Sequence, residues 1–317
     1  MNKLGFRGPK SAFNPSALLT AGLLCIVFLI IVYTVLYPIP NFIIGYLSWK
    51  ASAAAVPETG YVRRQHGDIH YVVYGKGEPL VLLHGGLSNK LCWFSQLPML
   101  VRSGRRVILL DTRGHGKSTP GNIEPSYQLY AQDVIGVLDR LHIDSTDVLG
   151  WSDGGNTALI LACRYPERIR SILLISANYN PEGLTPEIRR GNRKPYGRLR
   201  QWFNRFWTRS DREYPQLERQ VKKLWETSPR MTPAMLAAIT CPVLIIVGEH
   251  DYVSVAHARE MTEAVAKGKL AVIAGGGHST PITHAAEINR LVRRFLIDPE
   301  GSSRKIPTGS RASVQTK

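Results

Sequence analysis

Short runs of aliphatic residues recur through most of the chain, and they constrain its fold more than any other feature of the sequence. Most of them are bounded on at least one side by a glycine, a proline or an aspartate. Six such runs occupy residues 80–83, 107–110, 148–149, 172–175, 243–247 and 270–273. Runs of this kind are typical of strands that are buried on both faces of a parallel sheet.

The segments around these runs have the spacing of other regular elements. Residues 127–138 and 288–296 repeat apolar side chains at i, i+3, i+4 and i+7, which predicts helices. Residues 61–65 and 69–74 are predicted as two strands joined by a hairpin turn. A hairpin followed by repeated strand–helix units predicts an α/β fold with a mostly parallel, doubly wound sheet and helices on both faces.

A long insertion divides the predicted core, which covers residues 60–177 and 240–297. Residues 178–239 are rich in arginine and tryptophan and have helical character. Roughly sixty residues is far beyond the usual length of a connection between a strand and a helix. We therefore predict a helical cap here, with an ordinary but very long connection as the alternative.

The N-terminal region has the composition of a membrane segment. No charged residue occurs between Lys10 and Lys50, and residues 17–37 form a run rich in Leu, Ile and Val. As a helix, this run would be about 31 Å long, which matches the hydrocarbon core of a bilayer. We predict a transmembrane signal anchor over 17–37. A cleavable signal peptide is the alternative, because residues 51–53 resemble a cleavage site.

The segments flanking this anchor complete the predicted layout. The positive-inside rule places the basic residues 1–16 in the cytoplasm. The catalytic domain would then be extracytoplasmic, and periplasmic if the source is a Gram-negative bacterium. Residues 38–59 are predicted as an interfacial segment and linker, and residues 298–317 as a disordered basic tail.

The net charge of +16 is concentrated in three places. Residues 1–10, 178–241 and 299–317 carry 13 of the 16 charges, and no motif for DNA or RNA recognition is present. We therefore predict no nucleic-acid partner. The four cysteines are widely spaced without a CxxC pair, and the nine histidines form no HExxH pattern, so no metal site is predicted.

A serine set between glycines is the main chemical signal. Gly150 and Gly154 flank Ser152 in the order G-x-S-x-G, after a predicted strand and before an apolar helix. A tight strand-to-helix turn needs glycines there, because the two backbones pass too close for Cβ atoms. The helix N-terminus adds partial positive charge near the serine. Ser152 is thus the predicted nucleophile.

A serine nucleophile needs a base and an acid, which this topology places after the last two predicted strands. Asp251 follows the strand at 243–247, and His278 lies in a glycine-rich loop after the strand at 270–273. We predict that His278 is the base and Asp251 the acid. Glu249 is the alternative acid, and His115 and His284 are the alternative bases.

Two backbone amides are predicted to bind the oxyanion. The loop HGGLSN at residues 84–89 follows a strand and can offer the N–H of Gly86, with Leu87 as the alternative. The N–H of Asp153 would be the second donor. The Asp153 side chain could cap the following helix or could face the pocket and favour a substrate bearing an amine. Asp153 and Trp151 are the predicted substrate-binding residues.

Five motifs in this order resemble the α/β-hydrolase superfamily over about residues 60–297. They are HGGLSN at 84–89, DTRGHGKS at 111–118, GWSDGG at 150–155, GEHD at 248–251 and GGGHS at 275–279. The GWSDGG sequence and the short helical cap resemble the branch of valacyclovir-hydrolase-like, small-ester hydrolases. The anchor and the basic tail lie outside the resemblance.

This resemblance implies an eight-stranded sheet, a cap over the site, no cofactor, and hydrolysis of an ester, thioester, lactone or amide. In this superfamily the DTRGHGKS motif is chiefly structural, so no chemistry is assigned to Asp111, Arg113 or His115. Ser152 argues against haloalkane dehalogenases and epoxide hydrolases, which have Asp at that position. The HGG segment lacks the continuation common in carbon–carbon bond hydrolases, which weakens that option without removing it.

The leading prediction is a membrane-anchored serine hydrolase that cleaves a small carboxylic ester through a Ser-His-Asp triad and an acyl-enzyme. Cofactor-free haloperoxidase or perhydrolase chemistry on the same triad is one alternative. A non-catalytic protein that binds a small ligand on the same scaffold is the other. The sequence does not define the acyl substrate or the oligomeric state.

Overall fold

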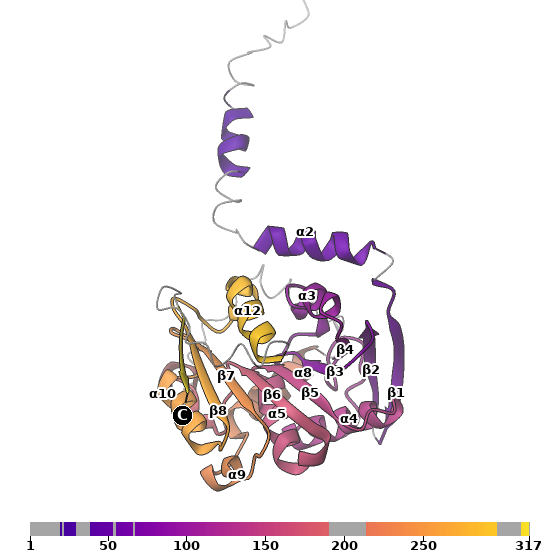
Figure 1. Cartoon of the computed structure of the whole chain (residues 1–317), viewed down its shortest axis with the longest axis vertical. Helices are drawn as coiled ribbons and strands as arrows, with labels where there is room; N and C mark the ends of the chain where they lie inside the picture. Colours follow the sequence, from indigo (N-terminus) through magenta and orange to yellow (C-terminus); the bar gives the residue numbers. More distant parts are fainter. Residues whose placement is uncertain are drawn as a thin grey trace, which may run out of the picture. The chain divides into compact units, whose positions relative to one another are not determined.

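A computed structural model shows the fold of the chain (Figure 1). The residues that the structure describes are 20, 22–29, 39–52, 55–65, 67–189, 214–296 and 312–316. The chain divides into two units, Met1–Asn41 and Phe42–Lys317. All the elements of the predicted core belong to the second unit.

One mixed sheet forms the centre of the second unit, with the strand order β1-β2-β4-β3-β5-β6-β7-β8-β9. Its strands are β1 (Glu58–Arg64), β2 (Gly67–Tyr74), β3 (Pro79–Leu83), β4 (Arg106–Leu110), β5 (Thr146–Trp151), β6 (Ile169–Ile175), β7 (Val243–Gly248), β8 (Gly268–Ile273) and β9 (Ala312–Thr316). β1 and β2 form an antiparallel hairpin, and β3 to β8 are parallel. The six aliphatic runs thus form β3 to β8, and the eight-stranded, mostly parallel α/β sheet is confirmed.

The ninth strand differs from the sequence prediction. Residues 312–316 fall in the predicted disordered tail, yet the structure pairs them antiparallel with β8. β8 would otherwise be the edge of the sheet, where a row of backbone N–H and C=O groups can accept a further strand. The intervening residues 297–311 lie outside the described part of the chain.

Helices cover both faces of the sheet (Figure 1). They are α3 (Leu97–Arg102), α4 (Tyr127–Arg140), α5 (Asp153–Arg164), α10 (Val255–Ala264), α11 (Thr280–Thr283) and α12 (Ala285–Leu296), with short 3-10 turns η2 (Lys90–Trp93) and η3 (Pro166–Arg168). Alternate residues of each strand face opposite sides. In β3, Val81 and Leu83 pack with α4, α5 and α10, whereas Leu80 and Leu82 pack with α3 and α12. Burial on both faces explains why these strands are aliphatic throughout.

The predicted cap is only partly described. Its described elements are η4 (Pro181–Gly183), α6 (Pro186–Arg189), α8 (Tyr214–Thr227) and α9 (Pro233–Ala237), while residues 190–213 lie outside the described part. α8 has the predicted helical character. Met231, Leu236 and Ile239 are buried in the main core, so the chain has rejoined the core before residue 240.

Helix α2 (Ile39–Lys50) occupies much of the predicted interfacial segment and linker. Its C-terminal end is attached to the core: the ring centroids of Trp49 and Tyr74 lie 5.2 Å apart, and Lys50 Nζ donates to the Tyr74 hydroxyl at 2.6 Å. Most of the predicted anchor, 17–37, lies outside the described residues, of which 22–29 are helical. Across the described ranges, no helix is both long enough and apolar enough to cross a membrane.

Candidate active site

Ser152 lies on a sharp turn between β5 and α5. Its backbone has φ 54° and ψ −118°, a conformation that a non-glycine residue adopts only under strain. A Cβ atom at Gly150 would lie 2.3 Å from the Gly154 carbonyl oxygen, and one at Gly154 would lie 2.1 Å from the Leu83 carbonyl oxygen. Both contacts are far too short, so these positions admit only glycine. The prediction that backbone clearance requires glycine at both positions is therefore confirmed.

The structure brings the three predicted triad side chains together. Ser152 Oγ lies 3.0 Å from His278 Nε2, and His278 Nδ1 lies 2.7 Å from Asp251 Oδ1. Burial alone would raise the pKa of Asp251, but the hydrogen bond and charge of His278 hold that pKa below its usual value. The ionised carboxylate then accepts the Nδ1 proton, which leaves the Nε2 lone pair facing the serine hydroxyl.

The alternative acid and base lie elsewhere. Glu249 accepts a hydrogen bond from the backbone N–H of Gly275 at 2.8 Å, and its side chain is largely exposed. His284 lies at the end of α11 and contacts the Thr283 hydroxyl at 3.0 Å. His115 belongs to the loop that follows β4. Of the predicted candidates, Asp251 and His278 are the pair that meets Ser152.

Ser176 holds the Asp251 carboxylate, and the sequence alone did not indicate this contact. This residue follows β6, is 1% exposed and has φ 56°. Its hydroxyl donates to Asp251 Oδ2, which also accepts from the Gly248 N–H at 3.3 Å, while the Val253 N–H donates to Oδ1 at 3.2 Å. With the imidazole, these donors fix both carboxylate oxygens.

Aromatic side chains enclose the His278 imidazole. The Tyr252 ring stacks on it with centroids 4.9 Å apart and an interplanar angle of 24°. The Trp151 ring lies 6.1 Å away, and Trp151 Nε1 donates to the His278 carbonyl oxygen at 2.8 Å. The structure thus places Trp151, a predicted substrate-binding residue, against the loop that carries His278. Its role toward substrate stays a prediction.

The loop after β3 lies beside Ser152. A Cβ atom at Gly85 would lie 3.3 Å from the Cβ atom of Ser152. The N–H of Leu87 donates to His115 Nε2 at 3.1 Å, so the alternative oxyanion donor is already engaged. Gly86 is therefore the better candidate from this loop, as the sequence predicted, with the N–H of Asp153 at the start of α5 as its partner.

The Asp153 carboxylate faces α4 and α8. Its Oδ1 accepts from the Tyr127 hydroxyl at 3.0 Å and from Trp225 Nε1 at 2.7 Å, and the residue is 6% exposed. Burial first, and then the charge of Asp153, raise the pKa of Tyr127 well above its usual value. Tyr127 therefore stays a hydrogen donor. A Cβ atom at Gly86 would lie 2.3 Å from Asp153 Oδ2, so the carboxylate also adjoins the proposed oxyanion loop.

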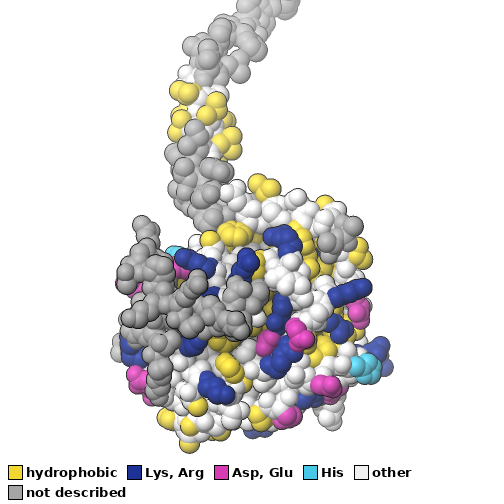
Figure 2. Space-filling view, viewed as in Figure 1, with side chains coloured by type: hydrophobic (Ala, Val, Ile, Leu, Met, Phe, Trp, Pro, Cys, Tyr) yellow, Lys and Arg dark blue, Asp and Glu magenta, His cyan; other side chains and the backbone are white. Residues whose placement is uncertain are grey.

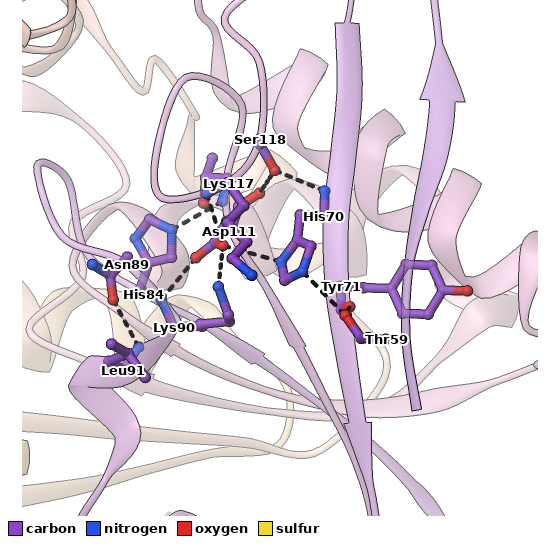
Figure 3. Close-up of polar contacts among 11 residues, drawn as sticks. Thr59, His70, Tyr71, His84, Asn89, Lys90, Leu91, Asp111, Lys117 and Ser118 are labelled. Carbon is purple, nitrogen blue, oxygen red and sulfur yellow. Dashed lines mark hydrogen bonds and ion pairs between the residues drawn. The ribbon is translucent and has the colours of Figure 1, made fainter. Parts of the chain in front are cut away.

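A buried network of charged side chains supports the loop after β3 (Figure 3). Asp111, at the end of β4, accepts from His70 Nδ1 at 3.2 Å, from the N–H groups of Lys90 and Lys117 at 3.1 Å each, and from Lys90 Nζ. Burial alone would raise the pKa of Asp111, whereas the hydrogen bond from His70 lowers it. The net effect is a pKa below the usual value of an aspartate. Asp111 thus ties the loop after β3 to the loop after β4.

His84 and His115 connect the same two loops as neutral side chains. His84 Nε2 accepts the Thr112 N–H at 2.9 Å, and its Nδ1–H donates to the Gly85 carbonyl at 2.8 Å. Burial, followed by the nearby His115, lowers the pKa of His84 to about 3. Every contact here is structural, and within the described ranges no three His, Cys, Asp or Glu side chains gather in a way that could hold a metal ion.

A parallel sheet with a serine on its strand-to-helix turn, a histidine and an aspartate defines the class of α/β enzymes with a nucleophile elbow. The chain belongs to the alpha/beta hydrolase family, because a sequence profile of that family matches residues 80–291. The family resemblance inferred from the five motifs is thereby confirmed.

Known proteins of this family resemble the chain over most of its length. Serine hydrolase BPHL of Mus musculus is 30% identical over 244 residues, 72% of this chain and 82% of that protein. 2-Hydroxymuconate semialdehyde hydrolase of Pseudomonas sp. (strain CF600) is 29% identical over 260 residues, 72% of this chain and 90% of that protein. The solved structure of "Est816 as an N-Acyl homoserine lactone degrading enzyme" is 27% identical with a TM-score of 0.60, covering 75% of this chain and 100% of that one.

Proposed function

We propose that the chain is a serine hydrolase that cleaves a small carboxylic ester, or a related thioester, lactone or amide. The observation that carries the proposal is the continuous set of contacts from Ser152 Oγ through His278 to Asp251. The strained turn presents the hydroxyl at the N-terminus of α5, where developing negative charge is favoured.

Acylation begins when Ser152 Oγ attacks the substrate carbonyl carbon and its proton passes to His278 Nε2. The carbonyl π bond becomes an oxyanion that accepts hydrogen bonds from the N–H groups of Gly86 and Asp153. The tetrahedral intermediate then expels the alcohol, which takes its proton from His278. Ser152 is left as an acyl ester, and Asp251 stabilises the imidazolium throughout.

Deacylation repeats these steps with water. His278 removes a proton from water as its oxygen adds to the acyl carbon, and the same amides bind the second oxyanion. The bond to Ser152 Oγ then breaks, and His278 returns the proton to the serine. The carboxylic acid leaves, and the enzyme is restored without any further reactant.

The test uses the full chain in mild detergent, since Trp49 and Tyr74 pack together and a shorter fragment would lose that contact. p-Nitrophenyl acetate and butyrate are the substrates, with Ser152→Ala as the inactive variant and Ser103→Ala, at the end of α3, as the matched serine control. Turnover retained in Ser152→Ala, or no turnover in the wild type, would contradict the proposal.

Two further arms separate the other functions predicted from the sequence. Bromination that depends on peroxide and acetate and exceeds ester turnover would favour haloperoxidase or perhydrolase chemistry. Failure of a fluorophosphonate to label Ser152, together with saturable binding of a small ester, would favour a non-catalytic binder.

We propose further that the Asp153 carboxylate selects substrates bearing an amine, in line with the resemblance to valacyclovir-hydrolase-like enzymes. A buried carboxylate beside the proposed oxyanion loop is a suitable partner for an ammonium group. Asp153→Ala should therefore lose far more activity on amino-acid esters than on neutral esters of equal size. An equal loss on both would remove this role.

We also propose that residues 17–37 anchor the chain in a membrane, with the N-terminus in the cytoplasm and the hydrolase domain outside. The described helical residues 22–29 expose apolar side chains, and Figure 2 shows such side chains gathered there while charges of both signs are scattered over the domain. The exposed set is Leu23, Leu24, Ile26, Val27, Phe28 and Leu29, each 44–65% exposed. Release of the chain from membranes by alkaline carbonate would contradict the anchor, and protease digestion from either side tests its orientation.

A further inference from the structure

Helix α8 of the cap packs against the loop that carries the proposed oxyanion donor. Leu217 and Val221 on α8 form a small apolar cluster with Leu87, and Trp225 packs against it. Leu217 is 5% exposed and Val221 is fully buried. Since Leu87 directly follows Gly86, this cluster holds one side of the proposed oxyanion hole.

Helix α8 also contacts Asp153, on the other side of the proposed oxyanion hole. Trp225 Nε1 donates to Asp153 Oδ1 at 2.7 Å. A Cβ atom at Gly86 would lie 2.3 Å from Asp153 Oδ2 and 2.8 Å from Trp225 Cζ2. The Gly86 backbone, the Asp153 carboxylate and the Trp225 indole are therefore in direct mutual contact.

We propose that α8, through Trp225, positions the two amide donors of the oxyanion hole, so that placement of the cap controls the rate of the chemical step. The proposal rests on the proposed serine-hydrolase function. Trp225 acts here as a positioning residue, because its indole reaches the amides through Asp153 and through the Gly86 backbone. An oxyanion donor acts only within about 2.7–3.1 Å of the oxyanion, so small shifts of either residue have large effects.

This role differs from that of a residue that only lines the pocket. A pocket-lining tryptophan would contribute equally to binding the substrate and the transition state, and its loss would raise KM. A residue that positions the oxyanion donors contributes mainly in the transition state, so its loss lowers kcat. The same loss must appear in the affinity for an inhibitor that forms an oxyanion.

The decisive variant is Trp225→Phe, which keeps an aromatic ring beside Gly86 and removes the hydrogen bond to Asp153. On p-nitrophenyl acetate we expect kcat to fall by roughly ten- to hundredfold with KM within about twofold, less than the 10²–10³ typical for loss of a whole donor. The inhibition constant of a trifluoromethyl ketone should rise by the same factor as kcat/KM falls.

Two matched variants define the source of the effect. Lys222→Ala changes an exposed side chain on the same helix, which pairs with Glu218, and should leave kcat and KM unchanged. Tyr127→Phe removes the other donor to Asp153 Oδ1 without altering the cap. We expect it to cost clearly less than Trp225→Phe. An equal cost would assign the effect to the charge of Asp153 and overturn the role of α8.

The remaining outcomes also decide the question. A raised KM with unchanged kcat in Trp225→Phe would make Trp225 a pocket wall, and unchanged kinetics would remove any role. If the wild type hydrolyses no ester, the proposed function fails, and the rate at which a fluorophosphonate labels Ser152 becomes the readout, since that attack also builds negative charge on oxygen. Equal labelling rates in wild type and Trp225→Phe, or no labelling of either, would then overturn the inference as well.

Discussion

Among the residues that the structure describes, two hydroxyl–histidine–aspartate hydrogen-bond chains have nearly the same geometry. In the proposed triad the two contacts of the imidazole measure 2.7 and 3.0 Å. In the second chain, His70 Nδ1 lies 3.2 Å from Asp111 Oδ2 and His70 Nε2 lies 3.1 Å from the Thr59 hydroxyl (Figure 3). Distances alone would make both of them candidates for nucleophilic catalysis.

The surroundings of the second chain remove its reactivity. Lys90 Nζ forms an ion pair with Asp111, so the carboxylate has another cation to balance and is less available to an imidazolium. The Thr59 hydroxyl also lies 3.3 Å from the Tyr71 carbonyl oxygen, to which it donates its proton. The single hydroxyl proton is thus divided between this carbonyl and the imidazole, and Thr59 lies within strand β1 instead of at the start of a helix.

The strained turn and the helix that follows it, more than the hydrogen-bonded chain, distinguish the two sites. Ser152 is half-buried and has an unfavourable positive φ, and α5 begins directly after it. The second chain joins β1 and β2 to the loops that follow β3 and β4, so we expect its residues to contribute to stability.

The largest difference should appear when each hydroxyl is removed. Ser152→Ala should lower kcat on p-nitrophenyl esters by about 10⁴–10⁶-fold, because it removes the hydroxyl on which the acyl-enzyme is proposed to form. Thr59→Val should change kcat by less than about twofold. Steady-state kinetics of both variants decide this, and a large loss in Thr59→Val would give the second chain a catalytic role.

The acid of the proposed triad should matter for rate more than for folding. Asp251→Asn should lower kcat by about 10⁴-fold, because the amide favours the wrong imidazole tautomer. Near-normal binding of a substrate analogue and a retained unfolding transition would show that the fold is intact. A loss below tenfold would mean that His278 is held by other groups.

The acid of the second chain should show the opposite balance. Asp111→Asn should reduce the free energy of unfolding by about 3 kcal/mol, because it leaves the nearly buried Lys90 without its counter-charge. Asp139→Asn is the control: its carboxylate is 59% exposed in its pair with Arg168, so about 0.5 kcal/mol or less is expected. Urea unfolding measures both, and equal values would remove the special role of Asp111.

Acid should weaken the supporting network through His84. Its pKa is lowered to about 3 by burial, whereas an unfolded histidine has a pKa of about 6.5. Between these values the unfolded state binds the extra proton, so stability falls as the pH drops, by up to about 1.4 kcal/mol per pH unit. In His84→Asn the free energy of unfolding should be lower at pH 7, but it should change less with pH between pH 6.5 and 4. An unchanged slope in His84→Asn would refute the assignment.

Features that depend on neighbouring residues could be predicted from the sequence. The aliphatic runs gave β3 to β8, and the spacing of Gly150, Ser152 and Gly154 gave the turn, because periodicity and backbone clearance are local properties. The order of serine, aspartate and histidine followed from the topology of such sheets. These inferences needed no knowledge of distant contacts.

Features that depend on contacts between distant parts of the chain could not be predicted from the sequence. Trp225 is 72 residues from Asp153 and Ser176 is 75 residues from Asp251, and neither position has a motif that marks it. Ser176 has a positive φ and donates its N–H to the Ile246 carbonyl of β7, but a serine after a strand has no distinctive sequence pattern. The pairing of residues 312–316 with β8 likewise depends on an open sheet edge, which the sequence of the tail does not reveal.

Substitution of Ser176 has the smallest expected effect and is the most specific test of the contrast between the two hydroxyl–histidine–aspartate chains. Its hydroxyl is one of the donors that hold Asp251, and the Gly248 and Val253 amides remain when it is removed. Ser176→Ala should therefore lower kcat only about three- to tenfold, with KM unchanged. The acid limb of the pH profile of kcat/KM should also be displaced, because a less stabilised carboxylate is a stronger base toward the imidazole. Ser176→Gly, which also relieves the positive φ, should lose the same activity but gain back stability. A stability loss without any change in the pH profile would make Ser176 a structural residue, like those around Asp111.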